Sequence, residues 1–459
     1  NKSEFIMSIV KNLTVSKFGG TSVADFEAML RCANIIKHDP TNRVVVVSAS
    51  SGVTNFLVRL SQSQVSLSEQ ANIIDKIKAI QLNITQYLST ETPLNKKIEQ
   101  LLAELAQHAK EQSLNHSLRT ADAILSYGEQ FSSIIFADVL QSINVNGKAF
   151  DVRQVMKTNS LFGKAVVELN ALHLQAQALL SPELDNYVIV TQGFIGQNQA
   201  GQTTTLGRGG SDYSAALLAE ALQANNLAIW TDVEGIFTTD PRITEQARAI
   251  KEISFGEAAE MATFGAKILH PATLIPAMRK NIPVFVGSSK APEQGGTRIQ
   301  KEVESSPTYR SIALRREQTL VTVKSPEMLH ASGFLAKVFA ILAEHELSVD
   351  LITTSEISVA LTFDNPAGST QAVITQSVVE DLEQLCEVKV ENGLSLVAII
   401  GNNIHTTSGI GNVIFDAVEG INIRMICQGA SAHNLCFLVP EEQANKVVEK
   451  LHHALFSIT

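Results

Sequence analysis

The segment Thr203–Leu222, TTTLGRGGSDYSAALLAEAL, places a cation, an acid and several glycines directly before an apolar run with helical spacing. Three of its residues can adopt backbone conformations closed to other residues, and so let N–H groups approach a phosphate: Gly207, Gly209 and Gly210. Arg208 adds a fixed positive charge, and Ser211 or Asp212 can cap the following helix. The pattern predicts a phosphate-binding loop at a helix N-terminus. The alternative is a glycine-rich surface turn before an ordinary helix.

A second glycine loop follows the β-rich run 10–18. Lys17 precedes Gly19 and Gly20, and a helical pattern begins at Phe26. A glycine loop between a strand and a helix N-terminus is a ready anion site in an open α/β sheet. The sequence has no GxxxxGKS or GxxxxGKT motif, so this is not a Walker A loop. Lys17 would therefore reach a phosphate from the strand end.

Two further segments carry polar side chains of interest. The continuous apolar run 43–51 is typical of a strand buried on both faces, and it leads into a small-residue loop with Ser48 and Thr54. Gly128 and Glu129 interrupt a helical stretch. A glycine inside a helix costs about 1 kcal/mol relative to alanine, which indicates close approach by another group. The alternative is a helix-packing glycine beside a solvated glutamate.

Short apolar strands alternate with helical stretches through the first 300 residues. The runs 187–193, 228–231 and 282–287 add to the two strands above, and each ends in a polar or glycine loop. This order predicts a mainly parallel, doubly wound α/β sheet with ligands bound over the strand C-termini. Residues 60–112 are predicted to form a helical insertion.

The pattern changes after about residue 300, where the polar segment 301–311 is predicted to be a linker. Two similar units of about 75 residues follow, each with the element order βαββαβ, which predicts two ferredoxin-like domains. The second strand of each unit is expected at 347–352 and 421–426. The predicted domains are 10–300, the linker 301–311, 312–392 and 393–459.

Composition narrows the possible partners and compartments. Hydrophobic residues make up 45% and charged residues 18%, as in a globular protein, and the net charge of −10 argues against a nucleic-acid partner. The four cysteines show no CxxC pair and no histidine at metal-ligand spacing, which favours a reducing compartment and no metal site. There is neither an apolar run of ~18 residues nor a signal peptide, so we expect a cytoplasmic protein without membrane contact.

Seven segments occur in an order that is specific when taken together: KFGGTSV, VSASSGVTN, YGEQ, TTTLGRGGSDY, WTDVEGIFTTDPR, MATFGAKILHP and VDLITTSE. They resemble the aspartokinases, which have the amino-acid kinase fold followed by two ACT domains. The resemblance covers nearly the whole chain and is greatest to the monofunctional, lysine-sensitive class. The length argues against the bifunctional form fused to homoserine dehydrogenase.

The resemblance implies a phosphotransferase with a carboxyl group as acceptor. Such an enzyme transfers the γ-phosphoryl group of ATP to the side-chain carboxylate of L-aspartate, giving 4-phospho-L-aspartate, the first step toward lysine, threonine and methionine. That carboxylate has a reference pKa of about 3.9 and is already ionised, so no general base is needed. Catalysis would rest on positioning, cationic screening and Mg²⁺ bridging the phosphates, held mostly by phosphates and water.

The resemblance also implies residue roles. Lys17, with the amides of the adjacent glycines, would screen the transferring phosphate, and Asp212 would orient the lysines. Glu129 would bind the substrate ammonium and Arg208 a substrate carboxylate. The residues implied to surround the amino acid with hydroxyl groups are Ser48 and Thr54. Those implied to hold the nucleotide are Lys17, Gly19, Gly20, Ser211, Thr231, Asp232, Phe237, Arg242 and Lys267. Phe237 stands where tyrosine is common, so a hydroxyl contact is lost there.

The resemblance further implies feedback inhibition by L-lysine, bound to the first ACT domain. Asp350 and Glu356 would receive its two ammonium groups, although solvated edge charges are the alternative. The implied effector-binding residues are Met328, Gly333, Phe334, Leu335, Ser348, Val349, Asp350, Thr354, Ser355 and Glu356. Because ACT sheets expose edge strands, we expect at least a homodimer.

Two other functions compete with this interpretation. One is a kinase of the same fold that acts on a different small carboxylate or phosphate acceptor. The other is a non-catalytic amino-acid sensor that has lost turnover. The joint presence of Lys17, Glu129, Arg208 and Asp212 argues against the sensor.

Overall fold

The structure is a computed structural model that describes residues 12–456, with the exception of residues 90, 208, 266–268, 329–331 and 366–371. The chain forms two compact units. The first contains the described residues within 1–236, 249–255 and 267–303, and the second contains those within 237–248, 256–266 and 304–459. Each unit is described by itself.

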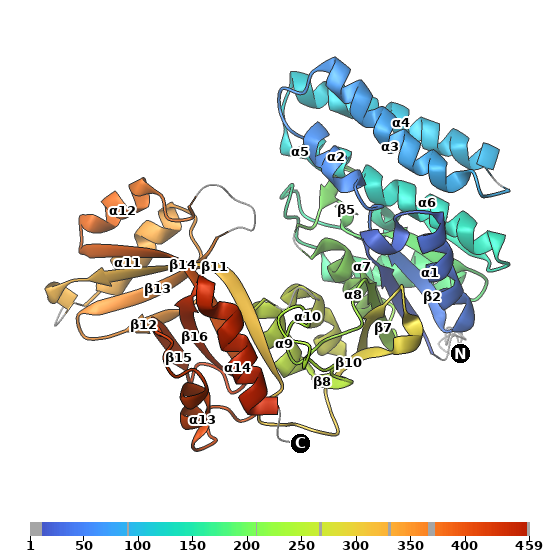
Figure 1. The fold of residues 1–459 in the computed structure, drawn as a ribbon. Helices are drawn as coiled ribbons and strands as arrows, with labels where there is room; N and C mark the ends of the chain where they lie inside the picture. Colours follow the sequence, from blue (N-terminus) through green and yellow to red (C-terminus); the bar gives the residue numbers. More distant parts are fainter. Residues whose placement is uncertain are drawn as a thin grey trace, which may run out of the picture. The chain divides into compact units, whose positions relative to one another are not determined.

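A mainly parallel sheet forms the centre of the first unit (Figure 1). Among the described residues it has eight strands in the order β3-β4-β2-β1-β7-β9-β10-β8. They are β1 (Thr14–Phe18), β2 (Asn42–Val47), β3 (Gly147–Phe150), β4 (Val188–Gln192), β7 (Asn226–Thr231), β8 (Glu252–Ser254), β9 (Val284–Ser288) and β10 (Gly296–Gln300). The pairs from β3 to β9 are parallel, and β10 is antiparallel to β9. The predicted doubly wound α/β sheet is confirmed.

Helices cover both faces of this sheet, which explains why every residue of β1 and β4 is buried. The helices α1 (Phe26–His38) and α6 (Tyr127–Ser142) share one core with the sheet, whose largest buried side chains include Phe18 and Phe131. On the opposite face lie α7 (Leu169–Gln175), α8 (Gly210–Ala221) and α10 (Pro271–Lys280). The hairpin of β5 (Ile195–Gln197) and β6 (Thr203–Thr205) leads from β4 to α8.

The predicted helical insertion, 60–112, contains α3 (Leu67–Thr85) and most of α4 (Glu91–Leu114). Helix α2 (Val53–Leu60) precedes it and α5 (Leu118–Leu125) follows it. Helices α3 and α4 lie side by side (Figure 1). Ile77, Ile98 and Leu105 are fully buried and belong to the same core as α1 and α6. The insertion is therefore packed onto the sheet unit.

Shorter helical turns connect these elements. They are η1 (Gly20–Val23), η2 (Val152–Gln154), η3 (Ala176–Leu180), η4 (Ser181–Glu183), η5 (Pro292–Gln294), η6 (Pro326–Met328) and η7 (Glu441–Gln443).

The second unit is built on an antiparallel sheet. Among the described residues it has six strands in the order β12-β13-β11-β14-β16-β15. The strands are β11 (Ser311–Lys324), β12 (Ile352–Thr354), β13 (Ser358–Asp364), β14 (Glu387–Ile400), β15 (Met425–Gln428) and β16 (Asn434–Pro440). The helices are α9 (Phe255–Thr263), α11 (Phe334–Glu344), α12 (Gln376–Glu383), α13 (Ile410–Ala417) and α14 (Ala444–Phe456).

The two C-terminal repeats share the long strands β11 and β14. One core gathers Val321 and Leu361 from the first repeat, and the other gathers Val397 and Phe437 from the second. Ile312, at the start of β11, packs in the second of these cores. The first half of β11 therefore contributes to the second repeat, although it precedes the first repeat in sequence.

Two predicted strands begin later than expected. The strands expected at 347–352 and 421–426 are observed as β12 from Ile352 and β15 from Met425. In the first case the N–H groups of Asp350 and Leu351 both bond to Thr362, one to its carbonyl and one to its hydroxyl. Regular ladder pairing can therefore start only at Ile352.

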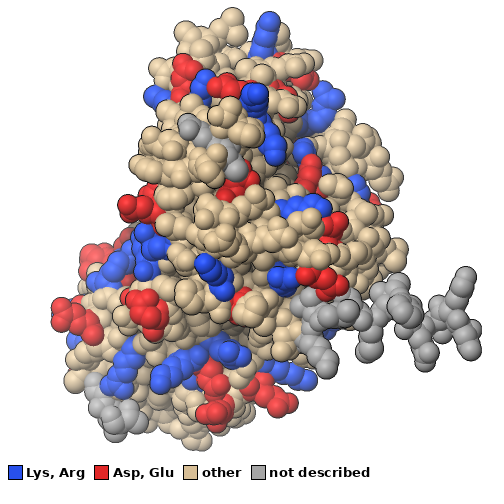
Figure 2. All heavy atoms as spheres, turned by 90° about the vertical axis from the view of Figure 1, so that its right-hand side faces the viewer, with Lys and Arg blue, Asp and Glu red and all other residues tan. Residues whose placement is uncertain are grey.

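Surface charge and helix hydropathy add two observations. In the view of Figure 2, acidic and basic side chains are interspersed over the visible face. No helix among the described residues combines the length and the apolar character that crossing a membrane requires.

Candidate functional site

The carboxyl ends of the central strands meet at one edge of the first unit's sheet. Strand β1 ends at Phe18, β2 at Val47 and β7 at Thr231. The chain passes from β1 to β2 on one side and later to β7 on the other, so the strand order reverses at β1. Open α/β sheets bind ligands at such a reversal, which makes this edge the candidate site.

The centre of this edge holds an ion pair between Lys17 and Asp212. Lys17 Nζ lies 2.7 Å from Asp212 Oδ1, and the two side chains are only 11% and 19% exposed. Shielding from water makes this attraction stronger than that of a surface pair. Asp212 lies in the first turn of α8, where the helix dipole favours a negative charge. The two predicted catalytic residues are thus brought together from a strand and a helix.

The glycine loop before α8 differs from the prediction in one respect. Gly209 precedes the first helical residue with a φ of 73°, and no side chain caps the helix. The predicted cap by Ser211 or Asp212 is therefore wrong, because both lie inside the first turn and the Asp212 carboxylate is engaged in the ion pair. Gly207 also has a positive φ, of 76°. Gly210 does not, but a Cβ there would collide with the ring of Phe194.

Glu129 is a buried carboxyl group in the first turn of α6. Its Oε1 accepts a hydrogen bond of 3.1 Å from the N–H of Ala49. Gly128 permits this approach, since a Cβ there would lie 2.5 Å from Ala49 Cβ. Burial raises the pKa of Glu129 to about 7, although the Ala49 hydrogen bond and the charge of Lys17 lower it. The alternative of a solvated glutamate is therefore wrong, and the site offers a desolvated acid for a cationic group.

The predicted hydroxyl ligands lie near the end of β2. Ser48 is half-buried, and its N–H donates to Phe18 O at 3.1 Å. Thr54 is exposed in the first turn of α2. Ser48 therefore lies in the loop that follows β2, and Thr54 lies at the start of the helix that this loop leads into.

The glycines after β1 are closely surrounded. The N–H of Gly19 donates to Trp230 O at 3.2 Å, so this amide is engaged within the fold and not directed to a ligand. The predicted phosphate contact of the Gly19 amide is not supported by this arrangement. A Cβ on Gly20 would lie 2.8 Å from Ala49 O, so glycine allows the two loops to approach each other.

The predicted nucleotide-binding residues fall in both units. Thr231 ends β7, and its hydroxyl donates to Asp232 Oδ1 at 3.2 Å. Ser211 lies in the same unit, on α8. Phe237 and Arg242 belong to the second unit.

The Arg242 side chain is 84% exposed, and its guanidinium forms a 2.6 Å ion pair with Asp240. A phosphate would therefore compete with Asp240 for this guanidinium. Two other predicted cations, Arg208 and Lys267, lie outside the described residues.

The predicted lysine-binding residues all lie in the second unit. Met328 ends η6, and Gly333 precedes α11 with a φ of 90°. Thr354 ends β12, where all three residues are exposed. The remaining predicted members are Phe334, Leu335, Ser348, Val349, Asp350, Ser355 and Glu356.

Asp350, which is predicted to receive an ammonium group of lysine, forms an ion pair within the fold. Its Oδ2 lies 3.3 Å from Arg315 Nη2, and the same guanidinium also contacts Asp364. Burial raises the pKa of Asp350, while the charge of Arg315 lowers it. An incoming ammonium group would therefore compete with Arg315, whereas Glu356 is exposed.

Asp122 is a functional candidate that the sequence did not single out. It lies buried on α5 and accepts hydrogen bonds from the N–H of Thr205 (2.8 Å), the hydroxyl of Thr205 (2.9 Å) and the N–H of Gly163 (2.9 Å). These contacts hold the end of β6, just before the glycine loop. The only sequence signal is an acid in a helical stretch, which does not identify partners 41 and 83 residues away.

Comparison with known proteins agrees with this architecture. The chain matches the model of the amino acid kinase family over residues 12–288 and that of the ACT domain over residues 397–455. It is 52% identical to lysine-sensitive aspartokinase 3 of Escherichia coli, over 97% of this chain and 100% of that protein. It is 35% identical to chloroplastic aspartokinase 1 of Arabidopsis thaliana, over 99% of this chain and 82% of that protein.

Solved structures agree as well. The structure resembles E. coli aspartokinase III in complex with aspartate and ADP, the R-state, with a TM-score of 0.87 and 52% identity over 97% of this chain and 100% of that one. It also resembles E. coli aspartokinase III in complex with lysine and aspartate, the T-state, with a TM-score of 0.84 and 53% identity over 97% and 99%.

Proposed function

Because the chain belongs to the aspartokinases of the amino acid kinase family, we propose that it transfers the γ-phosphoryl group of ATP to the side-chain carboxylate of L-aspartate. The product is 4-phospho-L-aspartate, the first intermediate on the route to lysine, threonine and methionine. The observation that carries this proposal is the shielded Lys17–Asp212 ion pair at the strand ends, in the same unit as the buried Glu129.

The reaction joins two anions and needs no general base, because the aspartate carboxylate is ionised at neutral pH. One carboxylate oxygen forms a bond to the γ-phosphorus. The bond from that phosphorus to the β,γ-bridging oxygen breaks, and ADP leaves with the electron pair. Lys17 stabilises the charge on the transferring group, and Asp212 holds the Lys17 ammonium in place.

The amino acid is held by groups of opposite charge. Glu129 receives its ammonium group, and the Arg208 guanidinium matches its α-carboxylate. Ser48 and Thr54 contribute hydroxyls. The partly exposed edge thus positions the side-chain carboxylate, which itself must stay free to attack.

ATP is assigned to Lys17, Gly20, Ser211, Thr231, Asp232, Phe237, Arg242 and Lys267. Mg²⁺ supplies charge neutralisation on the phosphates when bound. Among the described residues, no group of three or more His, Cys, Asp or Glu side chains is arranged to hold a metal ion. The bound ion would be held mainly by phosphates and water, and a single carboxylate such as Asp232 could add one ligand.

L-Lysine is the proposed feedback inhibitor, bound in the first ACT domain. Its α-carboxylate is assigned to the loop before α11, where Gly333 opens the helix N-terminus. Glu356 and Asp350 receive the ammonium groups, with Arg315 displaced from Asp350 on binding.

The domain division and assembly belong to the same proposal. The kinase domain spans 10–300, the linker 301–311, and the ACT domains 312–392 and 393–459, with the first half of β11 completing the second ACT core. β12 lies at the edge of its sheet with all residues exposed, so it offers an edge to a second copy, and we expect at least a homodimer.

A coupled assay of ADP release tests the proposal, with L-aspartate, L-glutamate or no acceptor. We expect aspartate-dependent ADP release from the wild type. In the Lys17→Met variant we expect kcat to fall by about 10³-fold at an unchanged Tm, because several kcal/mol of transition-state stabilisation are lost. Lys148→Met is the matched control, since Lys148 forms an ion pair of the same length, 2.7 Å, with Glu183 but is 43% exposed.

Three outcomes would contradict the proposal. Equal kcat/KM with L-glutamate would indicate a kinase for other carboxylates. ADP release with no acceptor would indicate an ATPase. No turnover with any acceptor would indicate a non-catalytic sensor.

A further inference from the structure

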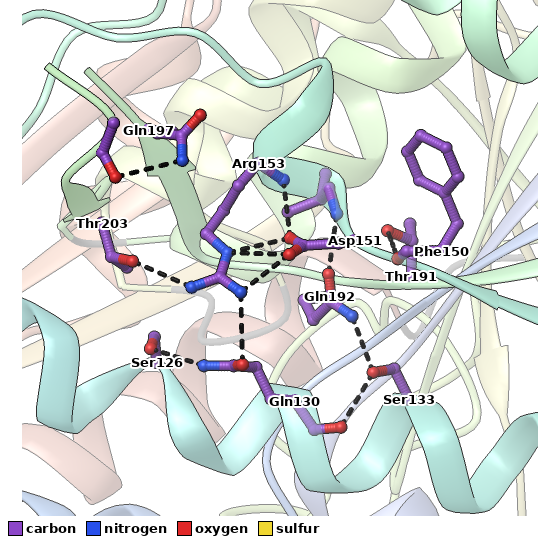
Figure 3. Close-up of polar contacts among 12 residues, drawn as sticks. Ser126, Gln130, Ser133, Phe150, Asp151, Arg153, Thr191, Gln192, Gln197 and Thr203 are labelled. Carbon is purple, nitrogen blue, oxygen red and sulfur yellow. Dashed lines mark hydrogen bonds and ion pairs between the residues drawn. The ribbon is translucent and has the colours of Figure 1, made fainter. Parts of the chain in front are cut away.

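Arg153 joins helix α6, which carries Glu129 of the proposed aspartate site, to strand β6 (Figure 3). Its Nη1 donates to Thr203 Oγ1 at 2.9 Å, and its Nη2 donates to Gln130 Oε1 at 3.3 Å. Gln130 follows Glu129 on α6, and Thr203 begins β6, which leads into the glycine loop that contains Arg208. The Arg153 guanidinium therefore forms hydrogen bonds to both α6 and β6.

Asp151 fixes the orientation of this guanidinium. Arg153 Nε donates to Asp151 Oδ1 at 2.9 Å and Nη2 donates to Oδ2 at 2.7 Å, while the backbone N–H of Arg153 donates to Oδ1 at 3.0 Å. Asp151 is thus both the ion-pair partner and the N-cap of η2. The contacts use the planar fork of arginine, which a lysine ammonium with one nitrogen cannot reproduce.

A second set of hydrogen bonds anchors the same turn to the sheet (Figure 3). The N–H of Val152 donates to Gln192 Oε1 at 2.8 Å, and Gln192 Nε2 donates to Ser133 Oγ at 2.8 Å. Gln192 ends β4, and Ser133 lies one turn after Glu129 on α6. The Ser133 hydroxyl in turn donates to the carbonyl of Gln130 at 3.0 Å. Helix α6 is therefore held to η2 at Gln130 and, through Gln192, at Ser133.

We propose that Arg153 is a positioning residue for the aspartate site, an inference that rests on the proposed function. It acts through Gln130 and Thr203, and it fixes the separation between α6, which carries Glu129, and β6, which precedes the proposed α-carboxylate ligand Arg208 in the sequence. Aspartate has its ammonium and α-carboxylate at a fixed spacing, so a change in that separation weakens aspartate binding. ATP is assigned to other residues and is unaffected.

Steady-state kinetics of Arg153→Gln, with aspartate and ATP varied separately, test this role. We expect the KM for aspartate to rise about tenfold, the size expected for the loss of one charge-assisted hydrogen bond, and the KM for ATP to stay within twofold. Thr203→Val keeps the Asp151 pair and should raise the KM for aspartate to a smaller extent. Adding Thr203→Val to Arg153→Gln should have no further effect, because the shared contact is already lost.

Two variants serve as controls. Arg43→Gln removes a guanidinium that also links two segments, through bonds of 2.8 Å to the carbonyls of Leu184 and Asp185, and should change neither KM. Arg153→Lys keeps the charge but loses the fork, and should behave like Arg153→Gln. Wild-type kinetics in Arg153→Lys would overturn the inference, as would a fall in Tm with both KM values unchanged or equal rises in both.

Glu129→Gln, measured in parallel, distinguishes failure of the proposed aspartate site from failure of the positioning role of Arg153. If Glu129→Gln leaves the KM for aspartate unchanged, the proposed assignment of α6 fails and the inference fails with it. If Glu129→Gln raises that KM and neither Arg153→Gln nor Thr203→Val does, only the positioning role is overturned.

Discussion

At the scale of single residues, Glu129 combines full burial with a hydrogen bond from Ala49 and the nearby charge of Lys17. Burial disfavours the ionised form, so the pKa rises from the usual 4.5 to about 7. The ammonium group of a bound aspartate would favour the ionised form of this carboxylate. Its ionisation should therefore be coupled to aspartate binding near neutral pH.

The pH dependence of kcat/KM for aspartate tests this coupling. Below pH 7 Glu129 is protonated in the free enzyme and cannot pair with the ammonium group, so kcat/KM should fall by about tenfold per pH unit. Glu129→Gln should have a lower kcat/KM without this slope. An identical acid limb in wild type and variant would assign the titration to another group.

The raised pKa of Glu129 also affects the free energy of unfolding. Its contribution to stability falls as the pH rises, whereas kcat/KM for aspartate should rise with pH. Because the folded pKa of Glu129 lies above its unfolded value, the folded state binds more protons between about pH 4.5 and 7. This group therefore contributes to the free energy of unfolding most fully below pH 4.5, and its contribution is lost as the pH rises through 7. Denaturant titrations of Glu129→Gln should lack this part of the pH dependence.

Sequence could single out Lys17, Glu129 and Asp212 as site candidates because each lies within a local motif. It could not predict Arg153 or Asp122, since their roles depend on partners up to 83 residues away. Nor could it predict that the Gly19 amide is taken by Trp230, because that contact exists only once β1 and β7 pair.

At the scale of elements, the short strand β6 is held by a different polar partner at each of its residues. Arg153 binds Thr203, the Thr158 hydroxyl lies 2.7 Å from that of Thr204, and Asp122 binds Thr205. A strand of three residues has little ladder pairing of its own. These side chains should therefore determine the position of the loop that follows.

Asp122→Asn tests the strongest of these contacts. An asparagine has only one acceptor oxygen, so it can accept either from the N–H groups of Thr205 and Gly163 or from the Thr205 hydroxyl, and it loses the charge that strengthens all three bonds. We expect a loss of about 1–3 kcal/mol in the free energy of unfolding, measured by denaturant titration, and a higher KM for aspartate. Asp75→Asn, at an exposed position on α3, is the matched control and should change neither quantity. Equal stability of the two variants would show that Asp122 does not hold the strand.

Element types were more predictable than element boundaries. The period of apolar residues indicated the parallel strands and the helical insertion, but not the late start of β12, which follows from hydrogen bonds to Thr362. The cap of α8 was predicted as a side chain because Ser211 and Asp212 follow the glycines. Gly209, with a positive φ, precedes the helix instead, and the Asp212 carboxylate pairs with Lys17.

At the scale of the whole molecule, the sequence predicted an α/β unit followed by two ferredoxin-like repeats. It did not predict that residues 237–248 belong with the C-terminal unit. That assignment depends on contacts over long sequence separations, such as the 2.8 Å hydrogen bond between Thr238 Oγ1 and His452 Nε2, 214 residues apart. This segment carries Phe237 and Arg242.

Lysine inhibition depends on the whole molecule, because the proposed effector-binding and aspartate-binding residues lie in different units. Lysine must bind one state of the enzyme more tightly than another, with a coupling of about 1–3 kcal/mol. Asp350 already pairs with Arg315 at 3.3 Å, so the exposed Glu356 should provide most of the recognition of the side-chain ammonium. Glu356→Ala and Thr354→Ile should therefore keep kcat in the absence of lysine and raise the inhibitory lysine concentration at least tenfold.

Glu383→Ala, at an exposed acid on α12 in the same repeat, is the matched control and should remain as sensitive to lysine as the wild type. The measurement is initial rate against lysine concentration at several fixed aspartate concentrations. Because the proposed effector site is separate from the aspartate site, lysine should lower the rate even at saturating aspartate. Wild-type activity that is indifferent to millimolar lysine, or inhibition that saturating aspartate abolishes, would show that the ACT residues do not bind the effector, and would leave the kinase assignment standing.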